Sequence, residues 1–188
     1  MTDRSQKSSV NGAFCGVIRE TALFDKRGAF DQMVPEVLMV RHEKGYFELP
    51  GGGIEDELPQ TTAMRETDEE AGVTIPSARL LIFVGTGVQL VPSPWITEKI
   101  DIFSNLVMLY RVKVNQNVSI RTQDVENTGT MWMGEKEILK RARAKDRLEP
   151  EMIPIVQARM ALRMLYPNRW GKEFFLRTPL ELGGGKIL

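Results

Sequence analysis

The apolar residues of the chain form short runs that predict β-strands, and stretches of helical spacing that predict helices. The short runs are rich in β-branched or large apolar side chains, which favours strands. The predicted strands are residues 13–18, 37–40, 79–84, 106–114 and 130–133. Residues 37–40 are apolar throughout, and this pattern indicates a central strand buried on both faces.

Helical segments are marked by their spacing and by the residues that end them. Pro59 suits a first helical turn and Gly72 suits the left-handed position after a last turn, so a helix is predicted between them. Residues 136–147 also follow a helical pattern. A methionine-rich apolar stripe near the C-terminus predicts a further helix packed on the sheet. Its members are Ile153, Val156, Met160 and Met164, and Pro167 ends it.

Polar segments containing proline or glycine separate these elements. Residues 24–35 hold two phenylalanines and are expected to form a long connection, lying over a substrate, a partner or the protein's own core. Residues 92–99 are proline-rich and are expected on the surface, where Trp95 could stack on a base or pin its own loop. Residues 1–11 predict a loose polar leader, and residues 174–188 could be mobile or cross to a partner subunit in a homodimer.

Together these elements predict an α+β fold, in which helices cover both faces of a mixed β-sheet. At 188 residues the chain is expected to form one domain, 1–188, with its core at about 12–167. Hydrophobic residues make up 42% and charged residues 27%, which is usual for a soluble globular protein. The formal net charge is zero, so no global field attracts nucleic acid or a membrane.

The scarcity of cysteine and histidine excludes several kinds of site. Cys15 is the only cysteine, which excludes an internal disulfide framework and fits a reducing compartment. It lies in an apolar run, so a buried, inert thiol is favoured over a nucleophile. His42 is the only histidine, so a zinc site and a Ser-His triad lack the residues they need. With no signal pattern and no membrane-length apolar run, a cytoplasmic protein is expected.

The predicted helix after Pro59 follows a glycine loop and presents three carboxylates on one face. Glu66, Glu69 and Glu70 stand at i, i+3 and i+4. Like charges at this spacing repel, so the cluster is either well solvated or holds a cation. Oxygen-only ligands select hard ions, Mg²⁺ first, with Mn²⁺ or Ca²⁺ as alternatives.

A spaced pattern joins the loop and the helix: Gly51, five residues, Glu57, seven residues, Arg65-Glu66, two residues, Glu69-Glu70, one residue, Gly72-Val73. This pattern resembles the Nudix box, which marks hydrolases of nucleoside diphosphates linked to another group. Thr67 stands where the family usually has a bulky aliphatic residue, and the loop is one residue shorter than usual before its first glutamate.

The resemblance implies an α/β/α sandwich and a divalent metal, Mg²⁺ or Mn²⁺, bridging the acids and a diphosphate. Glu66, Glu69 and Glu70 are the expected ligands, completed by a backbone carbonyl of Gly51 or Gly52. Arg65 lies one turn before Glu69, so an orienting ion pair is expected. Glu57 is expected to support Arg65 as a further carboxylate.

The general base has two candidate sources. The resemblance implies either a box glutamate, Glu69 or Glu70, or an acid from a later loop. Asp124 and Glu126 precede the predicted strand at Trp132, where such a loop acid is expected. An exposed loop acid without a catalytic role is the alternative for each of them.

The leading hypothesis is a Mg²⁺-dependent pyrophosphohydrolase of a nucleoside diphosphate linked to another moiety. A nucleotide-binding sensor or scaffold of the same fold is the alternative, and loss of box acids would favour it. A diphosphate isomerase would need cysteine and additional histidine around its metal. The expected partner is a small nucleotide-type substrate; a membrane is not expected, and among nucleic acids only capped RNA stays open.

Overall fold

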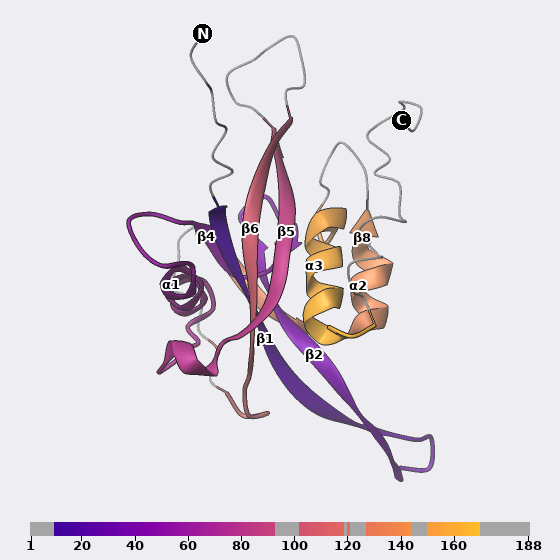
Figure 1. The fold of residues 1–188 in the computed structure, drawn as a ribbon. Coiled ribbons are helices and arrows are strands. Elements are labelled where there is room, and N and C mark those ends of the chain that lie inside the picture. Colours follow the sequence, from indigo (N-terminus) through magenta and orange to yellow (C-terminus); the bar gives the residue numbers. More distant parts are fainter. Residues whose placement is uncertain (1–9, 93–101, 119, 121–126, 144–149, 170–188) are drawn as a thin grey trace, which may run out of the picture.

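The structure, a computed structural model, describes residues 10–92, 102–118, 120, 127–143 and 150–169. A mixed sheet forms its centre, with helices on both sides (Figure 1). The strands of this sheet are β1 (Val10–Phe24), β2 (Phe30–His42), β3 (Phe47–Glu48), β4 (Gly51–Gly53), β5 (Ile82–Pro92), β6 (Ile102–Lys113) and β7 (Asn127–Met133). The remaining elements are α1 (Pro59–Ala71), a 3₁₀ turn η1 (Ala78–Leu80), α2 (Glu135–Arg141), α3 (Ile155–Leu165) and the short pair β8 (Ala142–Arg143) and β9 (Ile153–Pro154).

The long strand β1 is the centre of the sheet. The strand order is β3-β2-β1-β6-β5, with β4 paired to β1 and β7 paired to β2. β1 runs parallel to β6 and antiparallel to β2 and β4, so the predicted mixed sheet is confirmed. Along β1, β4 is the partner near the N-terminal end and β2 the partner further on. The glycines of β4 are thereby fixed against the middle of the sheet.

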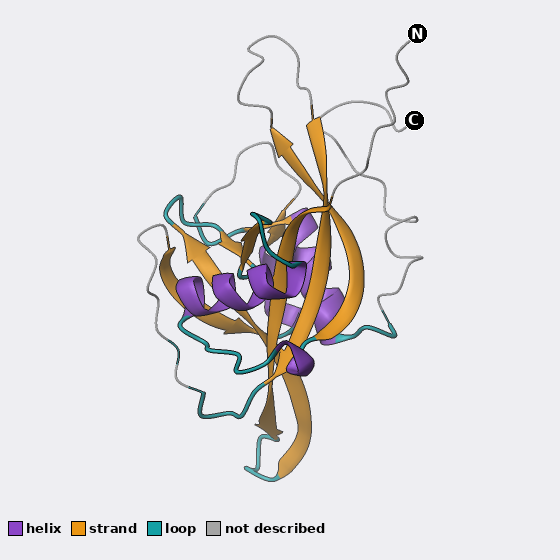
Figure 2. Cartoon of the chain, turned by 60° about the vertical axis from the view of Figure 1, so that its left-hand side comes forward, coloured by secondary structure: helices purple, strands orange, loops and turns teal. Residues whose placement is uncertain are grey.

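Alternation along β1 divides the core into two layers. Ala13, Cys15 and Val17 are buried in the layer that contains apolar residues of α1. Phe14 and Ile18 point the other way, into the layer that contains α3. Figure 2 shows α1 on one side of the strands and the other helices behind them. The expected α/β/α arrangement is therefore confirmed.

Close packing fixes α3 on its face of the sheet. A β carbon at Gly16 would stand 2.7 Å from the β carbon of Met164, so only glycine allows this approach. Beside it, Arg163 donates hydrogen bonds to the carbonyls of Val84 (3.1 Å) and Thr86 (2.9 Å) on β5. The terminal helix predicted from its methionine stripe is thus docked as expected.

The expectation of a long connection at 24–35 is wrong. β1 continues to Phe24 and β2 begins at Phe30, so the connection is a tight turn. Asp25 closes it, because its Oδ1 accepts hydrogen bonds from the N–H groups of Arg27 (2.8 Å) and Ala29 (2.9 Å). The two strands extend beyond the body of the sheet here, so their side chains lack the buried-exposed alternation that would have predicted them.

Several predicted boundaries also move. Residues 79–84 are only partly strand, because Ser77 Oγ accepts from the Arg79 N–H and caps the turn η1 before β5 begins. The helix predicted at 136–147 ends at Arg141, since the next two residues pair with β9. The last two residues of the leader predicted at 1–11 belong to β1, which begins at Val10.

Some expectations concern segments that the structure does not describe. Residues 1–9, 93–99 and 174–188 lie outside the described ranges. In the described part of the chain, no helix is both long enough and apolar enough to cross a membrane.

Candidate active site

The two residues before the glycine loop, Leu49 and Pro50, are fixed to the core by hydrogen bonds of their backbone groups. The Leu49 N–H donates to the buried side-chain oxygen of Gln157 at 3.1 Å, and the Cys15 N–H donates to the Pro50 carbonyl at 2.9 Å. Three glycines then follow as β4, paired antiparallel with residues 12–14 of β1. The loop therefore enters the site from a rigid strand, which gives its backbone atoms fixed positions.

Helix α1 has the boundaries that its sequence predicts. Pro59 stands at the first helical position, and Gly72 adopts φ 61° with its N–H donating to the Asp68 carbonyl. Thr67 faces the sheet and is fully buried. Its hydroxyl donates to the Ala63 carbonyl at 2.6 Å, which satisfies the polar group that replaces the usual aliphatic residue.

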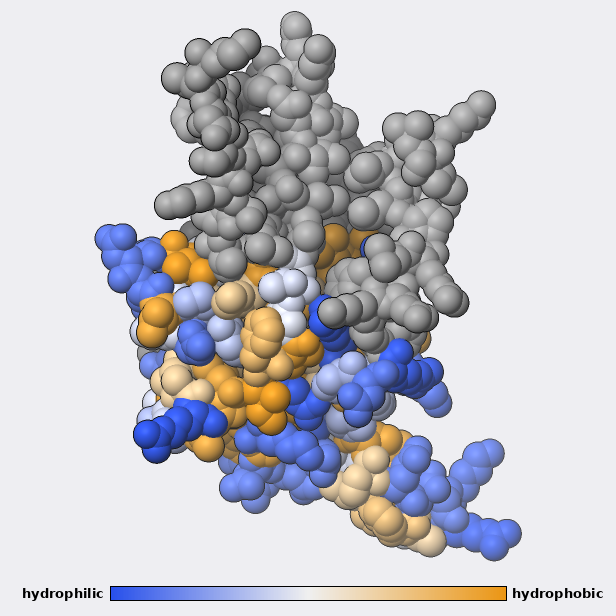
Figure 3. Space-filling model, in the orientation of Figure 1, coloured by the Kyte–Doolittle hydropathy of each residue, from blue (hydrophilic) through white to orange (hydrophobic). Residues whose placement is uncertain are grey.

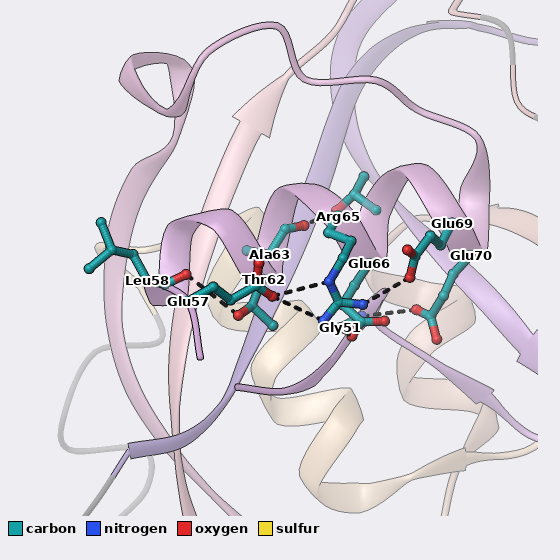
Figure 4. Close-up of polar contacts among 10 residues, drawn as sticks. Gly51, Glu57, Leu58, Thr62, Ala63, Arg65, Glu66, Glu69 and Glu70 are labelled. Atoms are coloured by element: carbon teal, nitrogen blue, oxygen red, sulfur yellow. Dashed lines mark hydrogen bonds and ion pairs between the residues drawn. The ribbon is translucent and has the colours of Figure 1, made fainter. Parts of the chain in front are cut away.

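Two box glutamates of α1 meet the glycine loop directly (Figure 4). The Gly51 N–H donates to Glu70 Oε2 at 2.9 Å. At Gly52, a β carbon would overlap Glu66 Oε1 and stand 2.7 Å from the Glu66 carboxyl carbon. Gly51 thus contacts α1 through its N–H, and Gly52 through its α carbon, each against a different carboxylate.

Arg65 is the centre of the charged network on α1. Its guanidinium contacts the carboxylates of Glu57 at 3.0 Å, Glu66 at 2.9 Å and Glu69 at 2.9 Å (Figure 4). A planar guanidinium carries several donors in fixed directions, so one arginine can serve these acids together. The expected Arg65–Glu69 pair and the support from Glu57 are both present in the structure.

Burial and charge act in opposite directions on this network. The Glu66 side chain is only 15% exposed. Burial raises the pKa of the Glu66 carboxyl, and the nearby Arg65 charge offsets this only in part. For Arg65, burial alone would lower the pKa, but the hydrogen bonds and charges of Glu57, Glu66 and Glu69 raise it above its ordinary value. Glu66 is therefore a carboxylate whose charge is incompletely compensated.

The donor chemistry of this cluster fits a hard divalent cation. Glu66, Glu69, Glu70 and the loop backbone at Gly51 and Gly52 offer only oxygen ligands. Within the described ranges, no three acidic, cysteine or histidine side chains are arranged to hold an ion. Arg65 engages Glu66 and Glu69 instead, while Gly51 engages Glu70. A cation at Glu66 would add positive charge beside a carboxylate that Arg65 compensates only in part.

A cavity of about 210 Å³ lies beside β4. It is smaller than the roughly 300–1,000 Å³ that holds a drug-sized ligand, so it suits one ring system or sugar of a larger molecule. The lining residues are Asn11, Gly12, Phe14, Glu48, Gly51, Gly52, Gly53 and Val107. The same glycines thus border both the cavity and the carboxylates of α1.

Sequence reasoning found one side of this site and missed the other. Gly51, Gly52, Arg65, Glu66, Glu69 and Glu70 are brought together as expected. The sequence did not predict that Asn11 and Glu48 line the cavity, because strand pairing places them there and no local motif marks them. Trp95, Asp124 and Glu126 lie outside the described residues, so their roles stay predictions.

Comparison with known proteins identifies the same protein family that the sequence of residues 51–73 resembles. The NUDIX domain profile matches residues 22–157. The chain therefore belongs to the Nudix family of hydrolases, which act on phosphoric anhydride bonds. Among curated protein sequences, none matches the chain.

Solved structures with this fold include two distant relatives. A C. elegans Ap4A hydrolase in a binary complex is 18% identical, with 70% of this chain and 85% of that chain covered and a TM-score of 0.50. The RNA complex of T. brucei MERS1 is also 18% identical, with 68% of this chain and 53% of that chain covered and a TM-score of 0.52. The chain thus spans about half the length of the T. brucei chain. At these identities the likeness concerns the fold alone.

Proposed function

We propose that the protein is a Mg²⁺-dependent pyrophosphohydrolase that cleaves a nucleoside diphosphate linked to another moiety. The observation that carries this proposal is the contact of Gly51 with Glu70 and of Gly52 with Glu66. It gathers carboxylates and loop backbone at one border of a cavity. A site this acidic would repel a diphosphate unless a cation lay between them.

The residues of the box have distinct proposed roles. Glu66, Glu69 and Glu70 would hold Mg²⁺ or Mn²⁺, with a backbone carbonyl of Gly51 or Gly52 completing the shell. When bound, such an ion supplies Lewis acidity and an acidified water for in-line attack on phosphorus. Arg65 orients Glu66 and Glu69 through its ion pairs, and Glu57 orients Arg65.

The proton acceptor is proposed to be either a box glutamate or a loop acid. Glu69 is half-exposed and lies at the outer side of the Arg65 network, so its carboxylate is accessible from solvent. Glu126 or Asp124, from the sequence before β7, is the alternative. Either residue would take the proton from the attacking water. Mutation distinguishes the two candidates, because only replacement of the actual base should abolish turnover for lack of a proton acceptor.

The cavity beside β4 is proposed to receive the nucleoside part of the substrate. Phe14 and Val107 offer it apolar walls, while Asn11 and Glu48 border it with polar groups. A carboxylate such as Glu48 accepts hydrogen bonds, so it favours a base or sugar that presents N–H or O–H donors. Trp95 is a further proposed contact, by stacking on the base.

The alternative function is a sensor or scaffold that binds a nucleotide without cleaving it. Such a protein has no need for the box acids, and this chain keeps Arg65, Glu66, Glu69 and Glu70 in mutual contact or beside the loop. The retained acids favour the enzyme.

The deciding experiment is a substrate panel assayed with Mg²⁺ and with chelator. Dinucleoside polyphosphates, nucleotide sugars, nucleoside triphosphates and capped RNA form the panel. T. brucei MERS1, which shares this fold, was solved with RNA and with GDP, which supports including RNA and guanine nucleotides. We expect release of a mononucleotide from at least one class, with Mg²⁺ only, and none from Glu70→Gln. Binding without turnover across the panel would favour the sensor.

A further inference from the structure

The β1–β2 hairpin leaves the body of the protein as a two-stranded arm. We define the arm as residues 19–36. β6 pairs with β1 only at residues 10–18, and β7 pairs with β2 only at residues 37–42. In the described part of the chain the two strands of the arm pair in the sheet only with each other, and they project away from it (Figure 1). Only the base of the arm contacts the body, where Arg19 lies over the Trp132 ring and Glu20 binds Lys113 and Gln116. An isolated two-stranded ribbon is marginally stable in water, so a surface that packs on it would stabilise it.

The arm exposes several apolar side chains. Ala22 pairs with Met33 and, beyond a register shift, Phe24 pairs with Phe30, so the two members of each pair lie side by side. Met33, Phe24 and Phe30 are each at least 43% exposed. The two phenylalanine rings contact edge to face with centroids 6.4 Å apart. Figure 3 shows this ribbon as a projection with hydrophobic colour between charged residues.

A second apolar surface lies where η1 joins β5. Leu80, Ile82 and Phe83, which we call the η1–β5 patch, are between 51% and 58% exposed. β5 is an edge strand, and its successive side chains point to opposite faces, so the patch wraps the edge of the sheet. Apart from Leu58 and Leu139, every large apolar side chain found exposed among the described residues belongs to the arm or to this patch.

We infer that the arm of one copy packs on the η1–β5 patch of a second copy, and the reverse, in a two-fold dimer. Both surfaces lie toward the same end of the molecule, on either side of the body (Figures 1 and 2). A two-fold axis at that end brings each arm to the other copy's patch. Each contact is then made twice, as a closed symmetric dimer requires.

The size of the arm favours this reciprocal contact over pairing of two arms alone. Six residues of an extended strand span about 20 Å, and the ribbon is two strands wide. Such a face is small beside the roughly 800 Å² that each partner buries in a stable complex. The reciprocal dimer uses the arm and the patch of each copy at once, so both apolar surfaces are covered.

One exposed residue beside each surface carries a charge opposite to that of the other. Asp31 follows Phe30 on the arm, and Arg79 precedes Leu80 at the patch. Neither side chain has an ion-pair partner within the described ranges, and both are exposed. Opposite charges beside two apolar surfaces fix the orientation in which those surfaces meet. Because one molecule carries both halves of this match, a second copy is the occupant that the structure favours.

Sedimentation equilibrium of the full chain tests the dimer through two variants. The arm variant is Phe24→Ser with Phe30→Ser, and the patch variant is Ile82→Ser with Phe83→Ser. We expect wild type to dimerise and each variant to dimerise at least 10-fold more weakly. A mixture of the two variants retains one intact contact, so it should form heterodimer more tightly than either variant forms homodimer. Monomeric wild type at 100 μM, or a patch variant that dimerises like wild type, would overturn the proposal.

A charge exchange tests the same contact with little risk to the fold. Asp31→Lys and Arg79→Glu should each weaken the dimer at low salt, and the double variant should regain most of the affinity. Leu139→Ser, at an exposed site on α2, is the control and should dimerise like wild type. A double variant no tighter than the single ones would contradict the arm-to-patch arrangement. The melting temperature of each variant confirms that it is folded.

Discussion

Gly52 lies directly against the carboxylate of Glu66, with room for a hydrogen atom and no more. A β carbon at position 52 would stand 2.7 Å from the Glu66 carboxyl carbon. Since Glu66 is a proposed metal ligand, this glycine keeps the loop from pushing the ligand out of place.

Gly52→Ala is therefore expected to impair turnover more than stability. The obstructed atom is the end of a flexible side chain, so the carboxylate can move aside at a cost of about 1 kcal/mol or less. Its displacement should lower kcat by about 10²-fold, the scale of a misplaced catalytic group. Steady-state kinetics and thermal melts measure both effects.

Gly53→Ala is the matched control for this variant. The nearest atom to a β carbon at position 53 is the Asn11 carbonyl oxygen at 3.9 Å, an ordinary contact. We expect kcat close to wild type, with any change confined to KM because Gly53 borders the cavity. Equal losses of kcat in both variants would show that the loop backbone, and not the Glu66 contact, matters.

Glu66→Gln should change how stability depends on pH. Burial raises the pKa of this carboxyl in the folded protein. A raised folded pKa means that the stabilising contribution is present below the ordinary pKa of glutamate and is lost as the pH rises through the folded value. In chelator, Glu66→Gln should thus melt at or above the wild-type temperature at pH 7–8, and the difference should shrink toward a pH of about 4.

The control for this comparison is Glu69→Gln. Glu69 contacts the same arginine, but its side chain is about half exposed, so solvent screens its charge. Its amide should therefore change the melting temperature in chelator at pH 7–8 less than Glu66→Gln does. A Glu66→Gln variant that is less stable than wild type at neutral pH would identify Glu66 as a structural salt-bridge partner of Arg65.

Glu70→Gln should separate metal binding from folding. An amide oxygen can still accept the Gly51 N–H, so the loop contact survives. Losing one charge from an acidic cluster should keep the melting temperature in chelator at or above wild type. The gain in melting temperature on adding Mg²⁺ should be smaller, since ligand stabilisation follows affinity for the native state, and most Mg²⁺-dependent activity should be lost. An equal Mg²⁺-induced shift with activity retained would exclude Glu70 as a ligand.

Glu126→Gln and Asp124→Asn test the source of the general base. If one of these acids takes the proton, its amide should lower kcat by about 10²-fold or more with little change in KM. The pH–rate profile of that variant should also lose its acidic limb. Wild-type turnover in both variants would return the role to Glu69 or Glu70.

Cys15 is expected to be unreactive in the native protein. It is fully buried, and its thiol pKa is raised to about 12, because burial outweighs the opposing hydrogen bond with Thr67. At pH 8 almost no thiolate forms, so a thiol reagent should react only as fast as the protein opens. Labelling rates with and without denaturant measure this. Rapid labelling of the folded protein would show that α1 leaves the sheet readily.

The sequence alone determined the elements whose signals are local. Pro59 and Gly72 set the ends of α1, and the helical period placed Arg65 one turn before Glu69. The apolar run at residues 37–40 identified a central strand, because a strand buried on both faces has no polar positions. Each of these features depends on residues within a few positions of one another.

The tertiary structure decided what depends on residues far apart in the chain. Asn11 and Glu48 both border the cavity because β4 pairs with β1 and β3 pairs with β2. Gln157 supports the loop from a helix more than a hundred residues away. The sequence did not predict the strands of the arm, because no core lies beneath them and burial therefore imposed no apolar-polar alternation on their residues. Local pattern records which face of an element is buried, whereas only the packed chain determines what lies against that face.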